Sequence, residues 1–185
     1  MQIKPLDYGE YKGFELDCHY VTKVYRNVQI KEDRAIKVII KRKKMKKTQK
    51  GFLASLYESH IKNGMAYGLF KGRNLIGVIE GSLESWNNTY RIWNFWVEQR
   101  YRREGYGTEL FTHIEKEASL LGARALILEV QSCNDPAIKF YEKMGLHFVG
   151  LDTIAYTNED IRQKEVRLEY GKRLVTDVKM NVENE

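Results

Sequence analysis

The residues whose types and spacing most clearly point to chemistry lie in the stretch Arg-Tyr-Arg-Arg-Glu-Gly-Tyr-Gly-Thr, residues 100–108. Gly105 and Gly107 let the backbone turn with positive φ and approach a ligand closely. A helix is predicted directly afterwards, and its first N–H groups would be unpaired at the positive end of its dipole. Arg102 and Arg103 would add charge-assisted hydrogen bonds to a phosphate. The stretch therefore predicts an anion-binding loop, with a glycine-rich turn carrying two surface arginines as the simpler alternative.

Two better-known phosphate-binding motifs are excluded at this position. The stretch lacks the third glycine of a dinucleotide-binding fingerprint, and it lacks the Gly-Lys-Ser/Thr ending of a P-loop. The composition favours an anionic partner without identifying one, because 31 Lys and Arg against 25 Asp and Glu give a formal charge of +6. A nucleotide cofactor would satisfy this charge as well as RNA would.

The elements that must position this loop follow from the hydrophobic pattern. Strands are predicted over residues 66–70, 75–83, 89–97, 125–130, 146–151 and 165–170. One helix is predicted after the loop, because apolar residues recur at helical intervals up to a stop at Gly122: Leu110, Phe111, Ile114, Ala118 and Leu121. A second helix opens at Asp135-Pro136 and stops at Gly145, with an inward face formed by Ala137, Ile138, Phe140, Tyr141 and Met144. This order predicts an α/β or α+β fold with at least one crossover between strands.

The first 63 residues carry weaker signals. Residues 14–30 and 35–40 are rich in Val, Ile and Tyr, which favours strands. Residues 41–50 hold seven Lys or Arg in ten positions, which indicates a solvated loop or a strand edge. A nucleic-acid patch is the less favoured alternative there, because no aromatic residues interleave the basic ones. Apolar residues at helical spacing predict a short helix over residues 51–63.

Two motifs in this order resemble the GNAT acetyltransferase superfamily. The first is Arg102-x-x-Gly105-x-Gly107, and the second is Asn134 followed by the segment Lys-Phe-Tyr-Glu-Lys-Met-Gly-Leu at residues 139–146. The resemblance covers roughly residues 66–170 and leaves residues 1–50 unassigned. It implies a GNAT-type fold, in which a mixed, mostly antiparallel sheet has two splayed parallel strands and flanking helices.

The resemblance also implies where acetyl-CoA binds. The pantetheine arm would lie in the gap between the splayed strands, beside Phe95 to Val97, with the Val97 N–H bonding a carbonyl oxygen. The side chain of Asn134 would bond the same arm. The pyrophosphate would be held by the backbone amides of the loop residues Arg103, Glu104, Gly105, Tyr106, Gly107 and Thr108.

Acetyl transfer to an amine needs a proton donor for the leaving thiolate and an acceptor for the amine proton. Tyr141 matches the family's usual donor, and its phenol is protonated at neutral pH; a core tyrosine on an amphipathic helix is the alternative. Glu129 is the one ionisable residue within the apolar strand 125–130. It could accept the proton directly or through water, bind a cationic substrate, or face a basic neighbour.

Within the superfamily, the sequence is most similar to streptothricin acetyltransferase-like proteins, in Trp86-Asn87-Asn88, in residues 128–131 with Asn134, and in residues 151–156. Those proteins commonly carry an acidic pair where this chain has Trp93 and Asn94. The predicted function is an acetyl-CoA-dependent N-acetyltransferase for a small primary amine, with streptothricin-like antibiotics among the implied acceptors. Alternatives are a lysine or N-terminal amine of a peptide as acceptor, and a non-catalytic acyl-CoA-binding module.

The remaining expectations concern organisation and setting. One domain is expected over residues 1–175, followed by a polar tail over 176–185. Cys18 and Cys133 form no metal-like spacing and no disulfide framework. Neither an apolar run of about 20 residues nor a signal sequence is present. We therefore expect a cytoplasmic monomer or homodimer that uses no metal, does not bind membranes, and is not primarily a nucleic-acid-binding protein.

Overall fold

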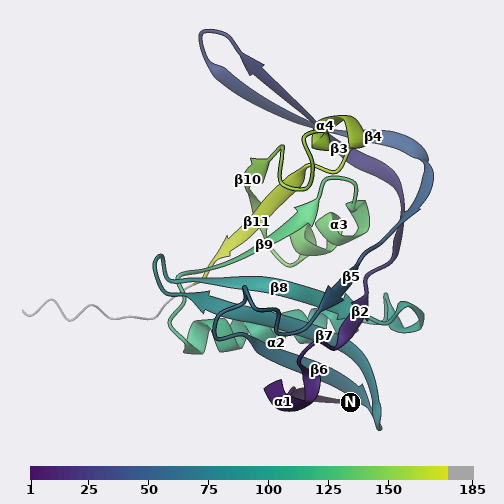
Figure 1. Cartoon of the computed structure of the whole chain (residues 1–185), viewed down its shortest axis with the longest axis vertical. Helices are drawn as coiled ribbons and strands as arrows, with labels where there is room; N and C mark the ends of the chain where they lie inside the picture. Colours follow the sequence, from purple (N-terminus) through teal and green to yellow (C-terminus); the bar gives the residue numbers. More distant parts are fainter. Residues whose placement is uncertain (175–185) are drawn as a thin grey trace, which may run out of the picture.

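A seven-stranded mixed sheet forms the centre of the molecule (Figure 1). The computed structural model describes residues 1–174 of the chain. In spatial order the sheet contains β1 (Gln2–Pro5), β6 (Met65–Lys71), β7 (Asn74–Glu84), β8 (Thr89–Val97), β9 (Ala125–Gln131), β11 (Arg167–Arg173) and β10 (His147–Asp152). Neighbouring strands are antiparallel except β8 and β9, which are parallel. The predicted fold class is confirmed, and the predicted strands lie within three residues of the observed ones.

The two parallel strands separate after a short paired segment. β8 pairs with β9 only from Thr89 to Ile92. On its other side, β8 places Ile92 opposite Gly81 and Asn94 opposite Glu80, so Trp93 is an extra residue in the strand. Such a bulge bends a strand and increases its twist. The predicted splay is therefore present, and together with the bulge it opens a gap between the second half of β8 and β9.

Two helices share one hydrophobic core with the sheet. They are α2 (Tyr106–Leu120) and α3 (Asp135–Lys143). The core cluster contains four of the five predicted apolar positions after the loop, while Leu121 is exposed at the end of α2. The predicted inward face of α3 is confirmed, since Ile138 and Tyr141 are buried and its other members pack against the same cluster. None of the helices within residues 1–174 is long and apolar enough to cross a membrane.

The N-terminal part of the chain covers the opposite face of the sheet with α1 (Tyr8–Tyr11), β2 (Glu15–Asp17) and β5 (Leu53–Ser55). The helix predicted over residues 51–63 is therefore wrong. Here β5 pairs with β2, and the segment then turns through Tyr57 and Asn63, whose φ angles of 58° and 52° are incompatible with a right-handed helix. Strand pairing with residues that are distant in sequence overrides the local helical spacing.

A long two-stranded ribbon projects from the sheet at the top of Figure 1. It consists of β3 (Tyr20–Glu32) and β4 (Ile36–Lys50), which pair along almost their whole length. This confirms the strand preference of residues 14–30 and 35–40. The basic residues 41–50 continue β4, in agreement with the predicted strand edge. The final strands are joined through α4 (Asp160–Gln163), and the predicted tail at 176–185 lies outside the described residues.

A carboxylate cage attaches the ribbon to α3. Asp135, at the start of α3, is 6% exposed. Its Oδ1 accepts hydrogen bonds from Arg26 Nη1 at 3.0 Å and Arg42 Nε at 3.1 Å, and Arg42 Nη2 binds Oδ2 at 3.2 Å. Lys139 lies 3.1 Å from Oδ2, and Arg26 also reaches Glu142 at 3.2 Å. Two arginines of the ribbon thus hold both ends of the same short helix.

Replacing Asp135 with asparagine should destabilise the fold in a pH-dependent way. Burial alone would raise the pKa of Asp135, but hydrogen bonds from Arg42 and Lys139 outweigh burial and lower it. The charge therefore stabilises the native state above the unfolded pKa of 3.8, and this contribution is lost as the pH falls through the lowered pKa. We expect Asp135→Asn to cost about 2–3 kcal/mol at pH 7 in urea denaturation, and less near pH 3.

The matched control is Arg162→Gln, which removes an ion pair with Glu159 in which both side chains are more than half exposed. The urea concentration at the midpoint of unfolding should be nearly the same for this variant as for the native protein. Equal stability losses for the two variants would contradict the structural role assigned to the cage.

Candidate functional site

The glycine-rich stretch forms the entry to α2. After β8 the chain makes a 3₁₀ turn, η1 (Gln99–Tyr101), and then passes Gly105, which has φ 95° and caps α2 without a side-chain hydrogen bond. The first helical bond runs from Glu109 N to Gly105 O at 3.1 Å. The amides of Tyr106, Gly107 and Thr108 consequently have no carbonyl partner within the helix and are positioned to bind an anion.

The two glycines have different roles. Gly105 needs its left-handed conformation, as predicted. Gly107 is the second residue of α2, and the positive φ predicted for it is wrong. A Cβ atom on Gly107 would lie 3.4 Å from Phe95 and 3.6 Å from Phe140. At this position glycine keeps the helix close to aromatic rings from β8 and α3.

The two arginines of the motif are used differently as well. Arg102 donates from Nε to Val97 O at 2.8 Å and from Nη1 to His19 O at 2.6 Å. Its guanidinium thus ties the loop to the end of β8 and to the chain before β3. Arg103 and Glu104 are exposed, and Arg103 has φ 69°. Of the two arginines, only Arg103 keeps its side chain open to a ligand.

The second half of β8 offers free backbone groups to the gap. Glu98 N bonds Ile76 O at 2.9 Å, so the hydrogen-bonded positions alternate back along β8 from Glu98. Phe95 and Val97 therefore point their N–H groups away from β7 and towards the gap, where pairing with β9 has already ended. An extended ligand could add to this edge as a strand does.

Tyr141 reaches the same gap from α3. Its side chain is 8% exposed, and its ring lies 6.4 Å from that of Phe95. Burial, with a smaller contribution from nearby Cys18, raises the pKa of the phenol well above its usual value. Burial likewise raises the pKa of the Cys18 thiol to about 11. The phenol is therefore protonated at neutral pH, and within residues 1–174 its hydroxyl makes no hydrogen bond.

Asn134 caps the same helix. Its Oδ1 accepts a hydrogen bond from Ala137 N at 3.2 Å, which fixes the side chain at the first turn of α3. Its Nδ2 has no hydrogen-bond partner in the described part of the chain and is available as a donor. Asn134 and Tyr141 thus lie at the start and near the end of one short helix, and Tyr141 is the one whose ring meets Phe95 of β8.

A second group of polar residues lies on the sheet face opposite the two helices. Glu129 points to this face because its neighbours Leu128 and Val130 face the core. Its side chain is 37% exposed, and its Oε2 lies 2.9 Å from Arg167 Nε. Arg167 Nη2 binds Glu169 Oε1 at 3.0 Å, and Arg91 Nη2 lies 3.4 Å from the same oxygen. These four residues form an alternating ionic chain across three strands.

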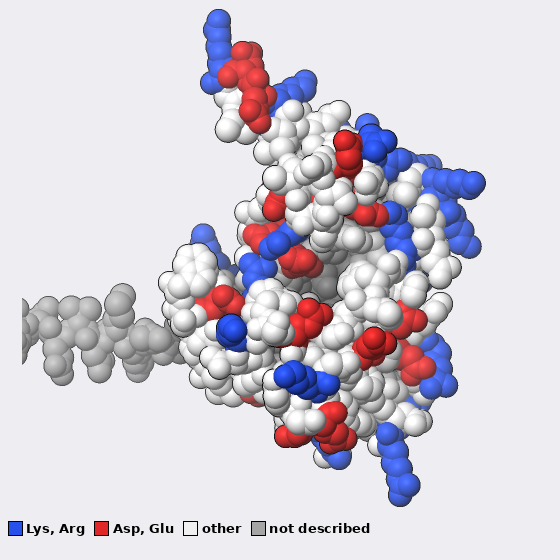
Figure 2. Space-filling view, viewed as in Figure 1, with Lys and Arg blue, Asp and Glu red and all other residues white. Residues whose placement is uncertain are grey.

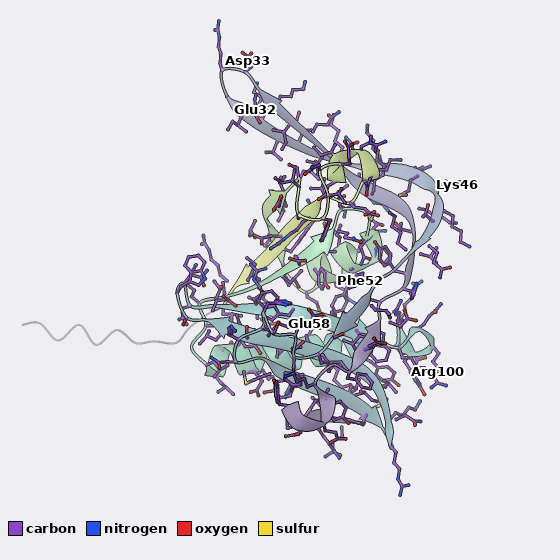
Figure 3. The ribbon with its side chains drawn as sticks, in the orientation of Figure 1. Glu32, Asp33, Lys46, Phe52, Glu58 and Arg100 are labelled. Carbon is purple, nitrogen blue, oxygen red and sulfur yellow. The ribbon has the colours of Figure 1, made fainter. Side chains whose placement is uncertain are left out.

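The bulge brings further groups to this face. Trp93 Nε1 donates to Ser82 Oγ at 2.8 Å, and the ring of His60 meets the indole edge-on at 5.2 Å. Asn94 Nδ2 donates to the buried carboxylate of Glu80 at 2.6 Å. This face is hollowed near its centre (Figure 2), and Glu58 and Phe52 lie beside the hollow (Figure 3).

The sequence profile described as "Acetyltransferase (GNAT) family" matches residues 34–146, more than half of the chain. The chain belongs to the GNAT family. A streptothricin acetyltransferase of Streptomyces lavendulae is 37% identical over 83 residues, which is 45% of this chain and 44% of that protein. The ribosomal protein bS18-alanine N-acetyltransferase of Escherichia coli K12 is 31% identical over 75 residues, 40% of this chain and 51% of that protein.

Two solved structures share the fold over nearly the whole chain, whereas the match spans about half the length of the curated relatives. A candidate streptothricin acetyltransferase of Bacillus anthracis, in complex with acetyl coenzyme A, has a TM-score of 0.74 at 22% identity. The match covers 94% of this chain and 97% of that one. A nourseothricin acetyltransferase has a TM-score of 0.71 at 21% identity, covering 93% and 97%.

In this GNAT chain, the structure brings most of the predicted cofactor residues together. The start of α2 and Tyr141 of α3 both lie against Phe95 on the free edge of β8, and Asn134 follows β9 at the start of α3. Glu129 lies on the other face of β9 and is paired with Arg167. Trp93 lies on that face as well, whereas Trp96 packs against the buried cluster that includes Leu16 and Leu56, and its Nε1 donates to Asp17 O at 2.9 Å.

Sequence reasoning missed Glu80. It is the only charged residue within the apolar strand predicted over residues 75–83, which is the same signal that identified Glu129. Its Oε1 accepts a hydrogen bond from Tyr57 N at 2.8 Å, while Oε2 is held by Asn94. Burial raises the pKa of Glu80, and the hydrogen bonds from Asn94 and Tyr57 offset this only in part. A search for isolated charges in every apolar strand would have found it.

The raised pKa of Glu80 predicts a stability change with pH. Protonated Glu80 contributes stability that is fully present below its unfolded pKa of 4.5 and lost as the pH rises through the higher folded pKa. A glutamine at position 80 is neutral at every pH. The native protein loses stability from pH 4.5 towards neutrality, so Glu80→Gln should become more stable relative to the native protein over this range. Thermal unfolding across this range measures the difference, and a constant difference would contradict the assignment.

Proposed function

We propose that this GNAT protein is an acetyl-CoA-dependent N-acetyltransferase that moves an acetyl group to a primary amine by direct attack in a ternary complex. The observation that carries the proposal is the meeting of three elements at Phe95 of β8. Within residues 1–174, the amides at the start of α2, the N–H groups of Phe95 and Val97 and the hydroxyl of Tyr141 have no protein partner, and both Gly107 of α2 and Tyr141 of α3 lie against the Phe95 ring. This arrangement suits a diphosphate, an extended arm and a reactive thioester in that order.

The residues available for the cofactor match its chemistry part by part. The amides of residues 103–108 and the exposed Arg103 would hold the pyrophosphate. Phe95 and Val97 would bond the pantetheine arm through their N–H groups, with Asn134 Nδ2 as a further donor. The N–H of Val97 is already fixed in the sheet, so little reorganisation is needed as negative charge develops on the carbonyl oxygen.

Two side chains would move the protons. Tyr141 would give its proton to the leaving thiolate, because its phenol is protonated at neutral pH. Glu129, on the opposite face of the same gap, would take the proton of the acceptor ammonium, directly or through a water molecule. Direct transfer then needs no covalent enzyme intermediate.

A small cationic amine is the acceptor that the opposite face supports best. Three glutamates with accessible side chains, Glu58, Glu129 and Glu169, belong to this face or lie beside its hollow, although the whole chain is positively charged. Streptothricin-like compounds are therefore retained among the proposed acceptors, and an N-terminal or lysine amine of a peptide is the alternative.

Tyr141→Phe should separate catalysis from binding. The substitution removes a hydroxyl that has no protein partner within residues 1–174, so folding should be unaffected. We expect kcat to fall by about 100-fold or more while the dissociation constant for acetyl-CoA stays nearly unchanged. Release of free CoA thiol with a panel of small amines and peptides measures turnover, and calorimetry measures binding.

The same panel distinguishes the alternatives. Preferred turnover of peptides would favour a peptide acceptor. Tight acetyl-CoA binding without turnover of any acceptor would show a non-catalytic acyl-CoA-binding module, and absence of acetyl-CoA binding would refute the proposal altogether.

Gly105→Ala should weaken acetyl-CoA binding beyond its effect on stability. Gly105 and Gly122 lie at opposite ends of α2, both have positive φ, and an added Cβ would meet nothing at either position. Alanine should therefore cost about 1–2 kcal/mol of stability at both sites. Only Gly105→Ala should raise the acetyl-CoA dissociation constant, because only that turn precedes the free amides. An equal loss of affinity in Gly122→Ala would contradict this role of the loop.

A further inference from the structure

Two carboxylates face each other directly across neighbouring strands on the acceptor side of the sheet. Glu129 of β9 and Glu169 of β11 are register partners, so their side chains project to the same face. Like charges directly opposite each other destabilise an antiparallel pair and disfavour simultaneous ionisation. A cation that contacts both carboxylates relieves this repulsion.

Arg167 is placed to be that cation. It lies two residues before Glu169 on β11, is 30% exposed, and contacts both carboxylates. Its Nη2 makes a directed hydrogen bond to Glu169 at 3.0 Å. Its Nε is 2.9 Å from Glu129 Oε2, yet the buried Nε–H makes no directed hydrogen bond there. The contact with Glu129 is therefore an ion pair of poor geometry, and the contact with Glu169 is the better of the two.

The surrounding charges are few. Arg91 of β8 reaches Glu169 at 3.4 Å, and Tyr156, from the connection between β10 and α4, lies close enough to Glu129 and Arg167 for their charges to affect its own pKa. With two arginines and two glutamates, the group is formally neutral. Removal of Arg167 would leave Glu129 with no cationic contact in the described residues.

We propose that Arg167 is the shared counter-ion of a cation-binding site formed by Glu129 and Glu169, and that it sets both the pH range of proton transfer and the preferred charge of the acceptor. The proposal rests on the function assigned above to Glu129. In the free protein Arg167 occupies the place that an acceptor ammonium must take. The ammonium displaces it from Glu129, and Arg167 stays bound to Glu169. Arg167 is thus a positioning residue that acts through Glu129.

The first test measures protonation without any acceptor. Carbon NMR of the glutamate carboxyl groups reports the titration midpoints of Glu129 and Glu169 in the native protein and in Arg167→Gln. We expect both midpoints to rise by about 1–3 pH units in the variant, because the two carboxylates then share a proton to higher pH. In Arg167→Gln/Glu169→Gln the midpoint of Glu129 should return towards its native value. Unchanged midpoints in the single variant would overturn the proposal.

The second test measures catalysis with hexylamine and hexane-1,6-diamine as probes. In Arg167→Gln the acid limb of kcat/KM should move to higher pH by the same amount as the midpoint of Glu129. At pH values above that limb, the ratio of the KM for the diamine to the KM for the monoamine should be about fivefold lower in Arg167→Gln than in the native protein. The reason is that loss of the arginine makes the site more negative by one charge. Arg167→Lys should restore most of the native profile. A purely structural role would lower activity equally at every pH.

Two controls keep the outcomes separate. Arg173→Gln changes an exposed arginine on the same strand and should leave midpoints and pH profile unchanged. Glu129→Gln tests the proposed function: full activity in that variant would refute the role of Glu129, whatever the NMR midpoints show. A shifted midpoint with an unshifted acid limb would refute the link between Arg167 and catalysis and leave the acetyltransferase assignment intact.

Discussion

The separation of β8 from β9 after Ile92 is the constraint on which the rest of the site depends. A parallel pair that continued to the ends of both strands would use the N–H groups of Phe95 and Val97 within the sheet. The extra residue at Trp93 prevents this by bending β8 away. Backbone groups that a sheet normally satisfies internally are thereby left for a ligand, on a scaffold that is rigid on its other side through β7. The first turn of α2 and Tyr141 of α3 then lie against Phe95 in this part of β8.

Local features of the chain were predictable from sequence, and features created by distant pairing were not. Gly105 and Asn134 act on residues adjacent to them, so the loop and the starts of both helices follow from short-range rules. The segment 51–63 has helical spacing, yet its structure is decided by β2, more than thirty residues earlier in the chain. The role of Gly107 also depends on distant residues, because the rings that lie against it come from β8 and α3.

The same division holds within the candidate site. Tyr141 and Glu129 were identifiable, one by its motif and the other as an isolated charge in an apolar strand. Their surroundings were not, because the register between β9 and β11 decides that Glu169 and Arg167 stand beside Glu129. No rule of sequence spacing gives that register. The sequence therefore identifies Glu129 as a candidate, but only the folded sheet shows which charged residues contact it.

The ribbon of β3 and β4 has a mechanical consequence. Arg26 and Arg42 grip the first turn of α3, and the strands continue from Arg42 to Ile36 over about 20 Å of extended chain. Because Asp135 follows Asn134 directly, these ion pairs connect the outer ribbon to the residue that caps α3. A molecule bound at the far end of the exposed ribbon would therefore be connected, through these two arginines, to the helix that carries Tyr141.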